Sequence, residues 1–375
     1  MLKYFLKNNY LALRKILLKC LLSHKAIDWI AAKDVDSILV VRIDKIGDLV
    51  VTVPALNALK AVFPRSSITC LLNPANLSLV RLIPGIDEVI VYHGFFPTLR
   101  LIKERKFSLA IDFLLDYPLK TALLVSLSTA KIKAGFDIEA RGQLFNVRLA
   151  PSTEKKSMSK YLLDLVRGLA KLAGKKEEDL ADSEPVLVLT AQDRSFAGDY
   201  LKERDIEDRD FIAGVAPGGK FPSQCWKEEG FAQLADRIVQ KYQAKIIIIG
   251  GKEEEKRIQR IVTFMKNKPV VIADLSLDKL AAIISRMKLL VCNNSGPLHL
   301  ACALGVATVS TMGPTVAHLW WPQGRDHIVI RRELACSPCN LSFCYKHDCM
   351  KLITVEEMEK AVDILMKKIA QRNNA

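Results

Sequence analysis

The sequence predicts an α/β protein made of two doubly wound domains. Short runs rich in Val, Ile and Leu alternate with helical stretches, and the alternation starts again after residue 210. This alternation is typical of parallel sheets with helices on both faces. The chain of 375 residues is long enough for about two domains. Each block of alternating elements is therefore expected to form one domain.

The predicted elements follow the same plan in both blocks. In the first block, strands are expected at 38–43, 67–72, 89–92 and 109–112, and helices at 52–63, 98–106, 118–128 and 160–174. In the second block, strands are expected at 211–215, 245–249, 270–273, 289–292 and 306–310, and helices at 227–242, 253–267, 277–286 and 298–304. A closing helix is expected at about 354–371, because Thr354 and Glu357 have the spacing of a capping box. The polar stretch 175–210 is the expected bridge between the two blocks.

Ligands of such sheets bind beyond the carboxyl ends of the strands, so the site is expected in a cleft between the domains.

The composition narrows the choice of partner and compartment. A formal net charge of +14 indicates an anionic partner. The sequence has no nucleic-acid motif and no basic patch with interleaved aromatic residues, so nucleic acid is not the expected partner. Nine cysteines without a signal peptide predict a reducing cytoplasm rather than a secreted disulfide scaffold.

The amino-terminal segment is strongly basic, with seven Lys and Arg residues and one acid, Asp28, in residues 1–33. The basic residues interrupt the apolar run too often for a transmembrane span or a signal peptide. An amphipathic helix is expected instead, with Leu2, Leu6, Leu13, Leu17, Cys20 and Ile27 on one side and Lys3, Lys7, Arg14 and Lys25 on the other. Two interpretations stay open: an interfacial helix that lies on an anionic bilayer, or an ordinary helix packed on its domain.

The loop after the first strand carries an acid in place of a glycine-rich phosphate cradle. Its single glycine, Gly47, is followed by Asp48, and the helix is expected to begin near Leu49. In one interpretation, Asp48 lies in the N-cap region and accepts hydrogen bonds from helix amides. In the other, its carboxylate faces the cleft and takes a proton from a hydroxyl nucleophile. The missing G-x-G-x-x-G pattern argues against a dinucleotide dehydrogenase.

Two turns of the second block are candidate sites for a phosphorylated ligand. After strand 211–215, Gly218 and Gly219 form a turn with free amides and Lys220 adds a positive charge, which suits a diphosphate. The alternative is a plain turn between strand and helix. After strand 245–249, Glu253 is either an acid that binds a ribose hydroxyl pair or an acid at a helix N-terminus.

A third turn follows strand 289–292, where Asn294, Ser295 and Gly296 lead into a helix. The amides and the dipole of a helix N-terminus form an anion site. His299 is expected in the first turn of this helix, either as a donor to a phosphate or as a packing residue.

A cysteine-rich segment, 336–349, contains Cys336, Cys339, Cys344 and Cys349. The group resembles a compact metal site, although its spacing is shorter than that of a standard two-pair zinc site. Three interpretations stay open: a bound metal ion, local disulfides, or free thiols that pack a loop.

In their order and spacing, these stretches resemble glycosyltransferase family 9, the ADP-heptose:lipopolysaccharide heptosyltransferases. The resemblance covers about residues 36–370 and rests on VRIDKIGDLVVTVPAL, APGGKFPSQCWKEEGFAQLADRI, IIIIGGKEEE, VCNNSGPLHLACALGVATVSTMGPT and the cysteine-rich tail. It implies a GT-B architecture of two Rossmann-like domains that face a cleft. The implied division is a basic extension at 1–35, an acceptor-side domain at 36–190, a donor-nucleotide-binding domain at 191–350 and a carboxyl-terminal helix at 351–375.

The resemblance implies inverting transfer of a heptose from ADP-heptose to a lipid-linked saccharide of the lipopolysaccharide inner core, without a metal or other cofactor. Asp48 is the implied general base. The implied donor-binding residues are Gly218, Gly219, Lys220, Glu253, Asn294, Ser295, Gly296 and His299. The implied location is the cytoplasmic face of the inner membrane of a Gram-negative-type cell, to whose anionic surface a basic protein is attracted.

Two positions depart from the family pattern, and both lie on the donor side. Asn294 stands where the family usually has Asp, and Gln224 stands where it often has Lys or Arg, so Lys220 or Lys227 is a candidate substitute. One alternative function is a transferase that uses another nucleotide sugar for a different surface glycan. Another is an inactive homologue that only binds a nucleotide sugar. A nucleotide-binding epimerase would need an internal acid/base pair, of which only Asp48 is evident.

Overall fold

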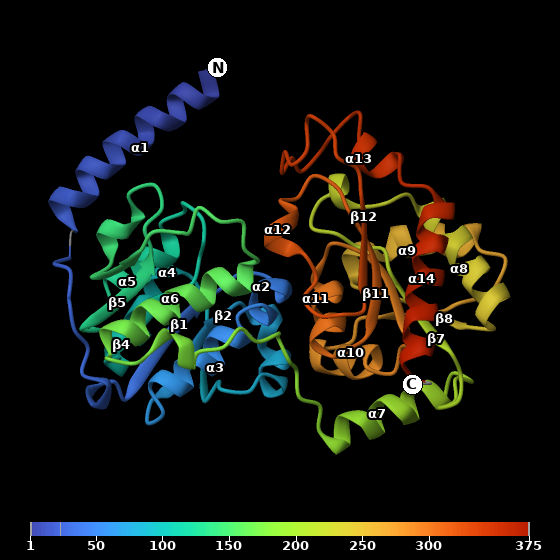
Figure 1. Ribbon diagram of the computed structural model, residues 1–375, viewed down its shortest axis with the longest axis horizontal. Coiled ribbons are helices and arrows are strands. Elements are labelled where there is room, and N and C mark those ends of the chain that lie inside the picture. The colour runs from blue at the N-terminus through green and yellow to red at the C-terminus, as the bar shows by residue number, and fades with distance from the viewer. Residues whose placement is uncertain (1, 23, 374–375) are drawn as a thin grey trace. The chain divides into compact units, whose positions relative to one another are not determined.

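The computed structural model describes residues 2–22 and 24–373, with the side chains of all of these except 2–9, 21 and 373. The chain forms two compact units, Met1–Ser183 and Glu184–Ala375 (Figure 1). Each unit is a parallel sheet with helices on its faces.

The sheet of unit 1 has the strand order β3-β2-β1-β4-β5-β6, and all its pairings are parallel. Its strands are β1 (Ser37–Arg42), β2 (Ser67–Leu72), β3 (Glu88–Val91), β4 (Leu109–Asp112), β5 (Ile132–Phe136) and β6 (Val147–Leu149). Its helices are α1 (Leu2–Leu21), α2 (Ile46–Val50), α3 (Val53–Val62), α4 (Phe95–Arg105), α5 (Lys120–Ser126) and α6 (Met158–Leu172). Helix α3 packs against α6, and α4 packs against α5.

The sheet of unit 2 has the order β12-β11-β10-β7-β8-β9 and is also fully parallel. Its strands are β7 (Ile212–Ala216), β8 (Lys245–Gly250), β9 (Val270–Ala273), β10 (Leu289–Asn293), β11 (Ala307–Met312) and β12 (His327–Arg331). Its helices are α7 (Ala191–Lys202), α8 (Glu228–Tyr242), α9 (Glu255–Phe264), α10 (Leu277–Ile284), α11 (Gly296–Ala303), α12 (Ala317–Trp320), α13 (Asp348–Lys351) and α14 (Val355–Asn373). Short 3₁₀ helices complete the chain: η1 (Ala32–Asp34), η2 (Pro74–Leu82), η3 (Arg141–Leu144), η4 (Glu177–Asp179), η5 (Pro222–Gln224) and η6 (Lys252–Glu254).

The two sheets have the same topology. Within each unit the first strand lies beside the second on one side and the fourth on the other, which gives the order 3-2-1-4-5-6. The connections therefore change direction between β1 and β4 in unit 1, and between β7 and β10 in unit 2. The carboxyl ends of these strand pairs are where doubly wound sheets bind ligands.

The predicted α/β class with two doubly wound blocks is confirmed. All nine predicted strands are present, with ends within two residues of those expected. Strands β5, β6 and β12 were not predicted. The expected bridge, 175–210, contains the boundary between the units and also helix α7, which packs against α10.

Helix α1 is present, but the side that faces the protein is not the side that the sequence pattern predicted. It ends at Leu21, so Lys25 and Ile27 do not belong to it. Arg14 was expected on the solvated side but is buried, whereas Leu13 and Leu17 of the predicted apolar side are exposed. The side chains of Leu2, Lys3, Leu6 and Lys7 lie outside the described residues.

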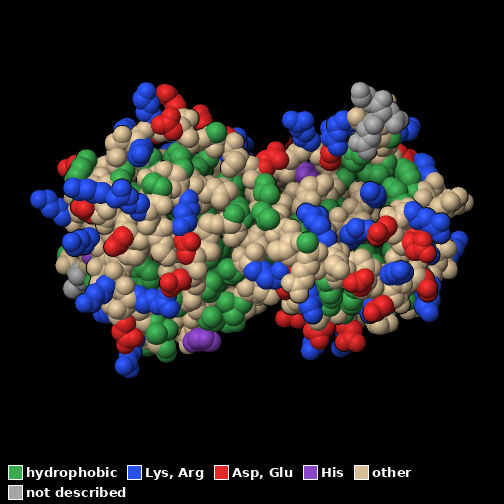
Figure 2. All heavy atoms as spheres, turned by 90° about the horizontal axis from the view of Figure 1, so that it is seen from below, with side chains coloured by type: hydrophobic (Ala, Val, Ile, Leu, Met, Phe, Trp, Pro, Cys, Tyr) green, Lys and Arg blue, Asp and Glu red, His purple; other side chains and the backbone are tan. Residues whose placement is uncertain are grey.

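The surface charge is spread over both units. On the face shown in Figure 2, Lys and Arg side chains occur across the whole view, with Asp and Glu side chains between them. Among the described residues, no helix combines the length and the hydrophobicity needed to cross a bilayer.

Candidate functional site

Asp48 lies just beyond the carboxyl end of β1, on the first turn of α2. The helix begins at Ile46, three residues earlier than predicted, with Lys45 as its N-cap. Asp48 is therefore the third helical residue, not the N-cap, and its Oδ2 accepts a hydrogen bond from the backbone N–H of Lys45 (3.2 Å). The side chain keeps 24% of its surface exposed, so the carboxylate remains accessible.

The buried guanidinium of Arg42 holds the loop that carries Asp48. Its Nε donates to Thr52 Oγ1 (3.1 Å) and to the carbonyl of Asp48 (3.2 Å). Its Nη1 donates to Asp44 Oδ2 (3.2 Å) and to the carbonyl of Phe113 (3.1 Å). Its Nη2 lies 3.5 Å from Asp48 Oδ1. Arg42 was not predicted as a site residue, although a charged residue at the end of an apolar strand was a visible signal.

A second buried ion pair lies beside this arrangement, at the end of β4. Asp112 pairs in register with Val41 of β1, and its carboxylate contacts the guanidinium of Arg141. Both side chains are fully buried. Arg141 also donates to Thr121 Oγ1 (3.2 Å) and to the carbonyl of Leu114. The loop after β4 is therefore fixed by charge-assisted hydrogen bonds at the same edge of the sheet as Asp48.

In unit 2, Asn293 occupies the corresponding position at the end of β10. Its fully buried amide donates to the carbonyls of Pro217 (2.7 Å) and Gly218 (3.1 Å). Its Oδ1 accepts from the N–H of Trp226 (2.9 Å) and from Thr311 Oγ1 (2.8 Å). All of its hydrogen-bonding capacity is thus used to hold the loop after β7 against β10. The prediction named its neighbour Asn294 and missed this residue.

The predicted glycine turn lies in that loop, and an acid packs against it. A Cβ on Gly218 would stand 2.6 Å from Glu254 Oε1, so any side chain at this position would displace the Glu254 carboxylate. Glu254 also accepts the N–H of Gly251 (2.7 Å). The predicted Glu253 is exposed, whereas Glu254 is half-buried and is the acid that lies beside the turn. Gly219 is half-buried in the same loop.

Lys220 is fully on the surface of this loop. Its Nζ lies 5.2 Å from the ring centroid of Phe221, and the side chain is exposed. The charge is therefore available to a ligand that binds at the loop.

The turn after β10 leads directly into α11. Asn294 donates to Thr315 Oγ1 (3.3 Å), and the hydroxyl of Ser295, the N-cap residue, donates to the carbonyl of Asn293 (3.3 Å). Ser295 makes no side-chain capping hydrogen bond to the first amides of α11, which begins at Gly296. These amides and the helix dipole favour an anion at this end.

His299 lies in α11 but is buried rather than directed at solvent. Its ring packs edge-to-face on Trp320, with centroids 5.8 Å apart. Burial lowers the pKa of His299 to about 4, so the imidazole is neutral near pH 7. It can contribute a neutral hydrogen-bonding group there, but no positive charge.

The cysteine-rich segment braces the loop after β7. All nine cysteines of the chain lie in the described part and are free thiols, so the predicted alternative of local disulfides is wrong. Within the described residues, no three His, Cys, Asp or Glu side chains are grouped so that they would hold a metal ion. Instead, Ser223 of the loop donates to the carbonyls of Ser342 (3.4 Å) and Leu341, and its own carbonyl accepts from His347 Nε2 (2.9 Å). The free-thiol interpretation, in which the segment packs a loop, fits these contacts.

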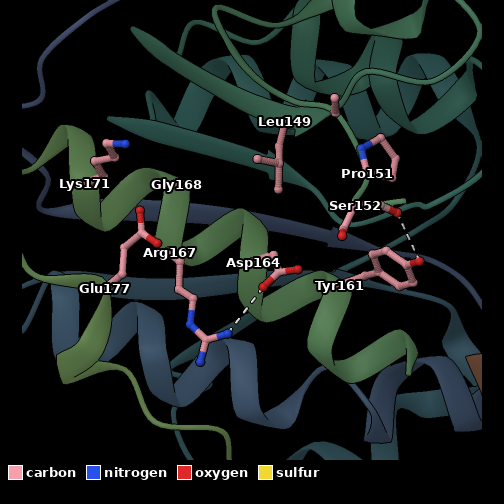
Figure 3. Close-up of a pocket in the computed structure, with 10 residues that line it drawn as sticks. Leu149, Pro151, Ser152, Tyr161, Asp164, Arg167, Gly168, Lys171 and Glu177 are labelled. Atoms are coloured by element: carbon pink, nitrogen blue, oxygen red, sulfur yellow. Dashed lines mark hydrogen bonds and ion pairs between the residues drawn. The ribbon is translucent and has the colours of Figure 1, made fainter. Parts of the chain in front are cut away.

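A separate pocket of about 300 Å³ lies between the end of β6 and α6 in unit 1 (Figure 3). Asp164 in its wall already pairs with Arg167 (3.3 Å) and with Lys156 (2.8 Å). Arg167 also bonds Asp182 (3.0 Å). These charges are satisfied within the unit, so the pocket is a weaker candidate than the edge that carries Asp48.

The fold agrees with comparisons to known proteins. The model of glycosyltransferase family 9 (heptosyltransferase) matches residues 98–348. The chain belongs to glycosyltransferase family 9. The match includes the whole glycine turn, Asn293 and the turn into α11.

Individual relatives of the family are more distant. The lipooligosaccharide heptosyltransferase 2 of Campylobacter jejuni is 30% identical over 165 residues, which are 42% of this chain and 51% of that protein. The chain thus matches about half the length of this relative. The lipopolysaccharide core heptosyltransferase OpsX of Haemophilus influenzae is 22% identical over 284 residues, 73% of this chain and 78% of that protein.

Solved structures support the fold over most of the chain. A family 9 glycosyltransferase from Veillonella parvula has a TM-score of 0.74 at 22% identity, over 89% of this chain and 99% of that chain. The ADP-heptose heptosyltransferase II of Escherichia coli has a TM-score of 0.73 at 20% identity, with the same coverage. The GT-B fold predicted for the chain is therefore confirmed.

Proposed function

We propose that the protein is an inverting heptosyltransferase that moves a heptose from ADP-heptose to a lipid-linked saccharide of the lipopolysaccharide inner core. The observation that carries the proposal is family membership across residues 98–348. The relatives named above are heptosyltransferases of lipopolysaccharide or lipooligosaccharide. Such an acceptor would bring the enzyme to the cytoplasmic face of the inner membrane.

On the acceptor side, Asp48 is the proposed general base. Its carboxylate is accessible, and contacts with Arg42 (3.5 Å) and the N–H of Lys45 (3.2 Å) fix its orientation. In the proposed step, the acceptor hydroxyl attacks the anomeric carbon of the donor as its proton passes to Asp48. The bond from the anomeric carbon to the diphosphate oxygen breaks, ADP leaves, and the configuration at the anomeric carbon inverts.

On the donor side, unit 2 offers uncharged hydrogen-bond donors and the exposed Lys220 to the departing diphosphate. The free amides at Ser295 and Gly296, the dipole of α11 and the ammonium of Lys220 would stabilise the charge that develops on ADP. His299 would act there only as a neutral group, because its pKa is about 4. Glu254, beside Gly218, is a better candidate for the ribose hydroxyls than the predicted Glu253.

Substitution of Asp48 tests the proposal. With ADP-heptose and a lipid-free core saccharide, Asp48→Asn is expected to lower kcat by roughly 10²–10⁴-fold, the usual contribution of a general base. Binding of ADP, measured by calorimetry, should remain as in the wild type. Asp44→Asn is the matched comparison, since Asp44 also pairs with Arg42 (3.2 Å). If Asp44→Asn lost as much activity as Asp48→Asn, or if Asp48→Asn kept near-normal kcat, Asp48 would not be the base.

The identity of the donor needs a separate measurement. Thermal stabilisation by ADP-, UDP- and GDP-linked sugars reports binding without turnover, because a ligand of the native state raises the melting temperature. Preference for an ADP-linked sugar is expected. Preference for a UDP- or GDP-linked sugar would point to a different surface glycan, and binding without any transfer would point to an inactive homologue.

A further inference from the structure

Helix α1 has two opposite faces that differ in what they contact. Leu11, Arg14 and Leu18 are at most 9% exposed and face unit 1. The open face carries four large apolar side chains with exposures from 48% to 62%: Tyr10, Leu13, Ile16 and Leu17. The apolar stripe that the sequence placed on this helix is thus largely uncovered.

The inner face fixes the helix on its unit. Leu18 belongs to the hydrophobic cluster that includes Leu39 and Val41 of β1, on the side of the sheet where α4 and α5 also pack (Figure 1). The Nη1 of Arg14 donates to the carbonyl of Tyr117 in the loop after β4 (2.8 Å). Rotation of the helix to bury its open face would break both contacts. The exposed stripe is therefore a stable surface feature of unit 1.

Charge distinguishes between possible occupants of this face. Lys15 and Lys19 are exposed on α1, and residues 1–33 contain a single acid, Asp28. Two copies of such a segment would repel each other, whereas a surface of anionic phospholipid complements it. Lys19 is three residues from Ile16 and lies beside it, whereas Lys15 is two residues from both Leu13 and Leu17 and points away from the open face. An exposed apolar face combined with lysines on the polar part of the helix is typical of interfacial helices.

We propose that α1 docks unit 1 onto an anionic bilayer, with Tyr10, Leu13, Ile16 and Leu17 inserted at the level of the headgroups and Lys19 beside the lipid phosphates. Lys15, on the polar side of the helix, adds to the positive charge that attracts the anionic surface. The opposite face holds the loop after β4, which lies at the same edge of the sheet as Asp48. Docking therefore presents this edge close to the membrane. The inference concerns a lipid surface and does not depend on the sugar that is transferred.

Co-sedimentation of the full chain with vesicles tests this docking. The wild type should bind vesicles that contain phosphatidylglycerol and bind phosphatidylcholine vesicles weakly, with a loss of binding as salt is raised. The double variant Leu13→Glu/Leu17→Glu should bind the anionic vesicles on the order of tenfold or more less tightly. Val186→Glu/Val188→Glu is the matched control, because these valines are 52% and 54% exposed in unit 2, and it should bind as the wild type does.

Three further measurements keep the result unambiguous. Circular dichroism and thermal melting should be unchanged in Leu13→Glu/Leu17→Glu, since both leucines are exposed. Transfer to a lipid-free acceptor should be as in the wild type, so failure of docking and failure of the transferase proposal can be distinguished. Lys15→Gln/Lys19→Gln should weaken binding to anionic vesicles several-fold. Equal vesicle binding by wild type and Leu13→Glu/Leu17→Glu would overturn the inference, as would a wild-type dimer that this variant converts to a monomer without any vesicle binding.

Discussion

The two units share one topology but fix their ligand-binding edges with opposite kinds of chemistry. At the end of the fourth strand, unit 1 places Asp112, which pairs with Arg141, while unit 2 places Asn293. Unit 1 adds a second buried cation, Arg42, against Asp44 and Asp48. In unit 2, the buried amide at this position makes neutral hydrogen bonds.

This difference suits the two halves of the proposed reaction. A carboxylate that accepts a proton needs to be held in place, and a neighbouring guanidinium holds it. At the end of β10, the neutral amide of Asn293 adds no negative charge to the loop proposed to receive a diphosphate, and the nearest acid, Glu254, is the residue proposed for the ribose hydroxyls. At the end of the fourth strand, a charged pair in unit 1 and a neutral amide in unit 2 thus hold the neighbouring loops.

The largest expected effect comes from breaking the charged pair of unit 1. Asp112→Ala leaves the buried guanidinium of Arg141 without its counter-ion and should lower the free energy of unfolding by about 3–5 kcal/mol. Urea denaturation followed by circular dichroism measures this. The double variant Asp112→Leu/Arg141→Met removes both charges and should lose less. A double variant that is less stable than Asp112→Ala would contradict the importance of the unpaired charge.

The next effect comes from giving unit 2 the charge of unit 1. Asn293→Asp loses the hydrogen bonds donated to Pro217 and Gly218 and turns a carboxylate toward their carbonyls. The free energy of unfolding should fall by about 2–3 kcal/mol, and stabilisation by ADP should decrease. Because protonation would neutralise the new carboxyl, the deficit relative to wild type should shrink in acid. A deficit that stays constant from neutral to acidic pH would count against this explanation.

Acidification should affect unit 2 through His299. Its pKa is about 4 in the folded protein and 6.5 ordinarily, so the unfolded chain binds the extra proton first. The stabilising effect of neutral His299 is therefore complete above pH 6.5 and is lost as pH falls toward 4. At pH 5 the loss should be about 2 kcal/mol. His299→Gln should remove this part of the pH dependence; an identical pH profile in wild type and variant would refute it.

The smallest expected effect comes from Lys220, the exposed lysine in the loop after β7. Lys220→Met should weaken ADP binding about two- to five-fold, because an exposed charge contributes roughly 0.5–1 kcal/mol. Isothermal calorimetry at low and high salt measures this, and salt should reduce the difference. Lys202→Met is the control, because Lys202 is also exposed but lies at the end of α7 and not in the loop after β7. This variant should bind ADP as the wild type does. No change in Lys220→Met at low salt would remove Lys220 from the donor site.

Two of the three strands that were not predicted, β5 and β6, lack a long apolar run, whereas β12 (HIVIR) has one and was missed as well. Strand β5 is IKAGF, in which Lys133 and Gly135 interrupt the apolar run, and β6 has three residues. Both strands are stabilised by pairing with neighbouring strands, β5 with β4 and β6 with β5, and such pairing is not evident from the local sequence pattern. Helix α7 lies in a polar stretch and was not predicted, because it has few buried apolar residues. Of its three buried residues, Ala197 and Leu201 are apolar and Asp193 is an acid.

The loops that carry the proposed site were predicted better than the side chains that hold these loops in place. Asp48 and the turns at Gly218 and Gly296 were found, because a strand followed by a turn and a helix has a clear pattern. Arg42 and Asn293 were missed, since their importance comes from partners distant in sequence. Even so, each is a polar residue at the end of an apolar strand, and this feature is visible in the sequence.

The indole Nε1 of Trp226 donates a hydrogen bond to the carbonyl of Ile353 (2.9 Å). The end of the loop after β7 is therefore held by a residue that lies more than a hundred positions later in the chain. Helix α14 continues this support, since Met358, Val362 and Leu365 belong to the same hydrophobic cluster as Trp226. A stable proteolytic fragment of unit 2 must therefore retain α14. An affinity tag is better fused after this helix than before α1, where it would obstruct the exposed apolar face.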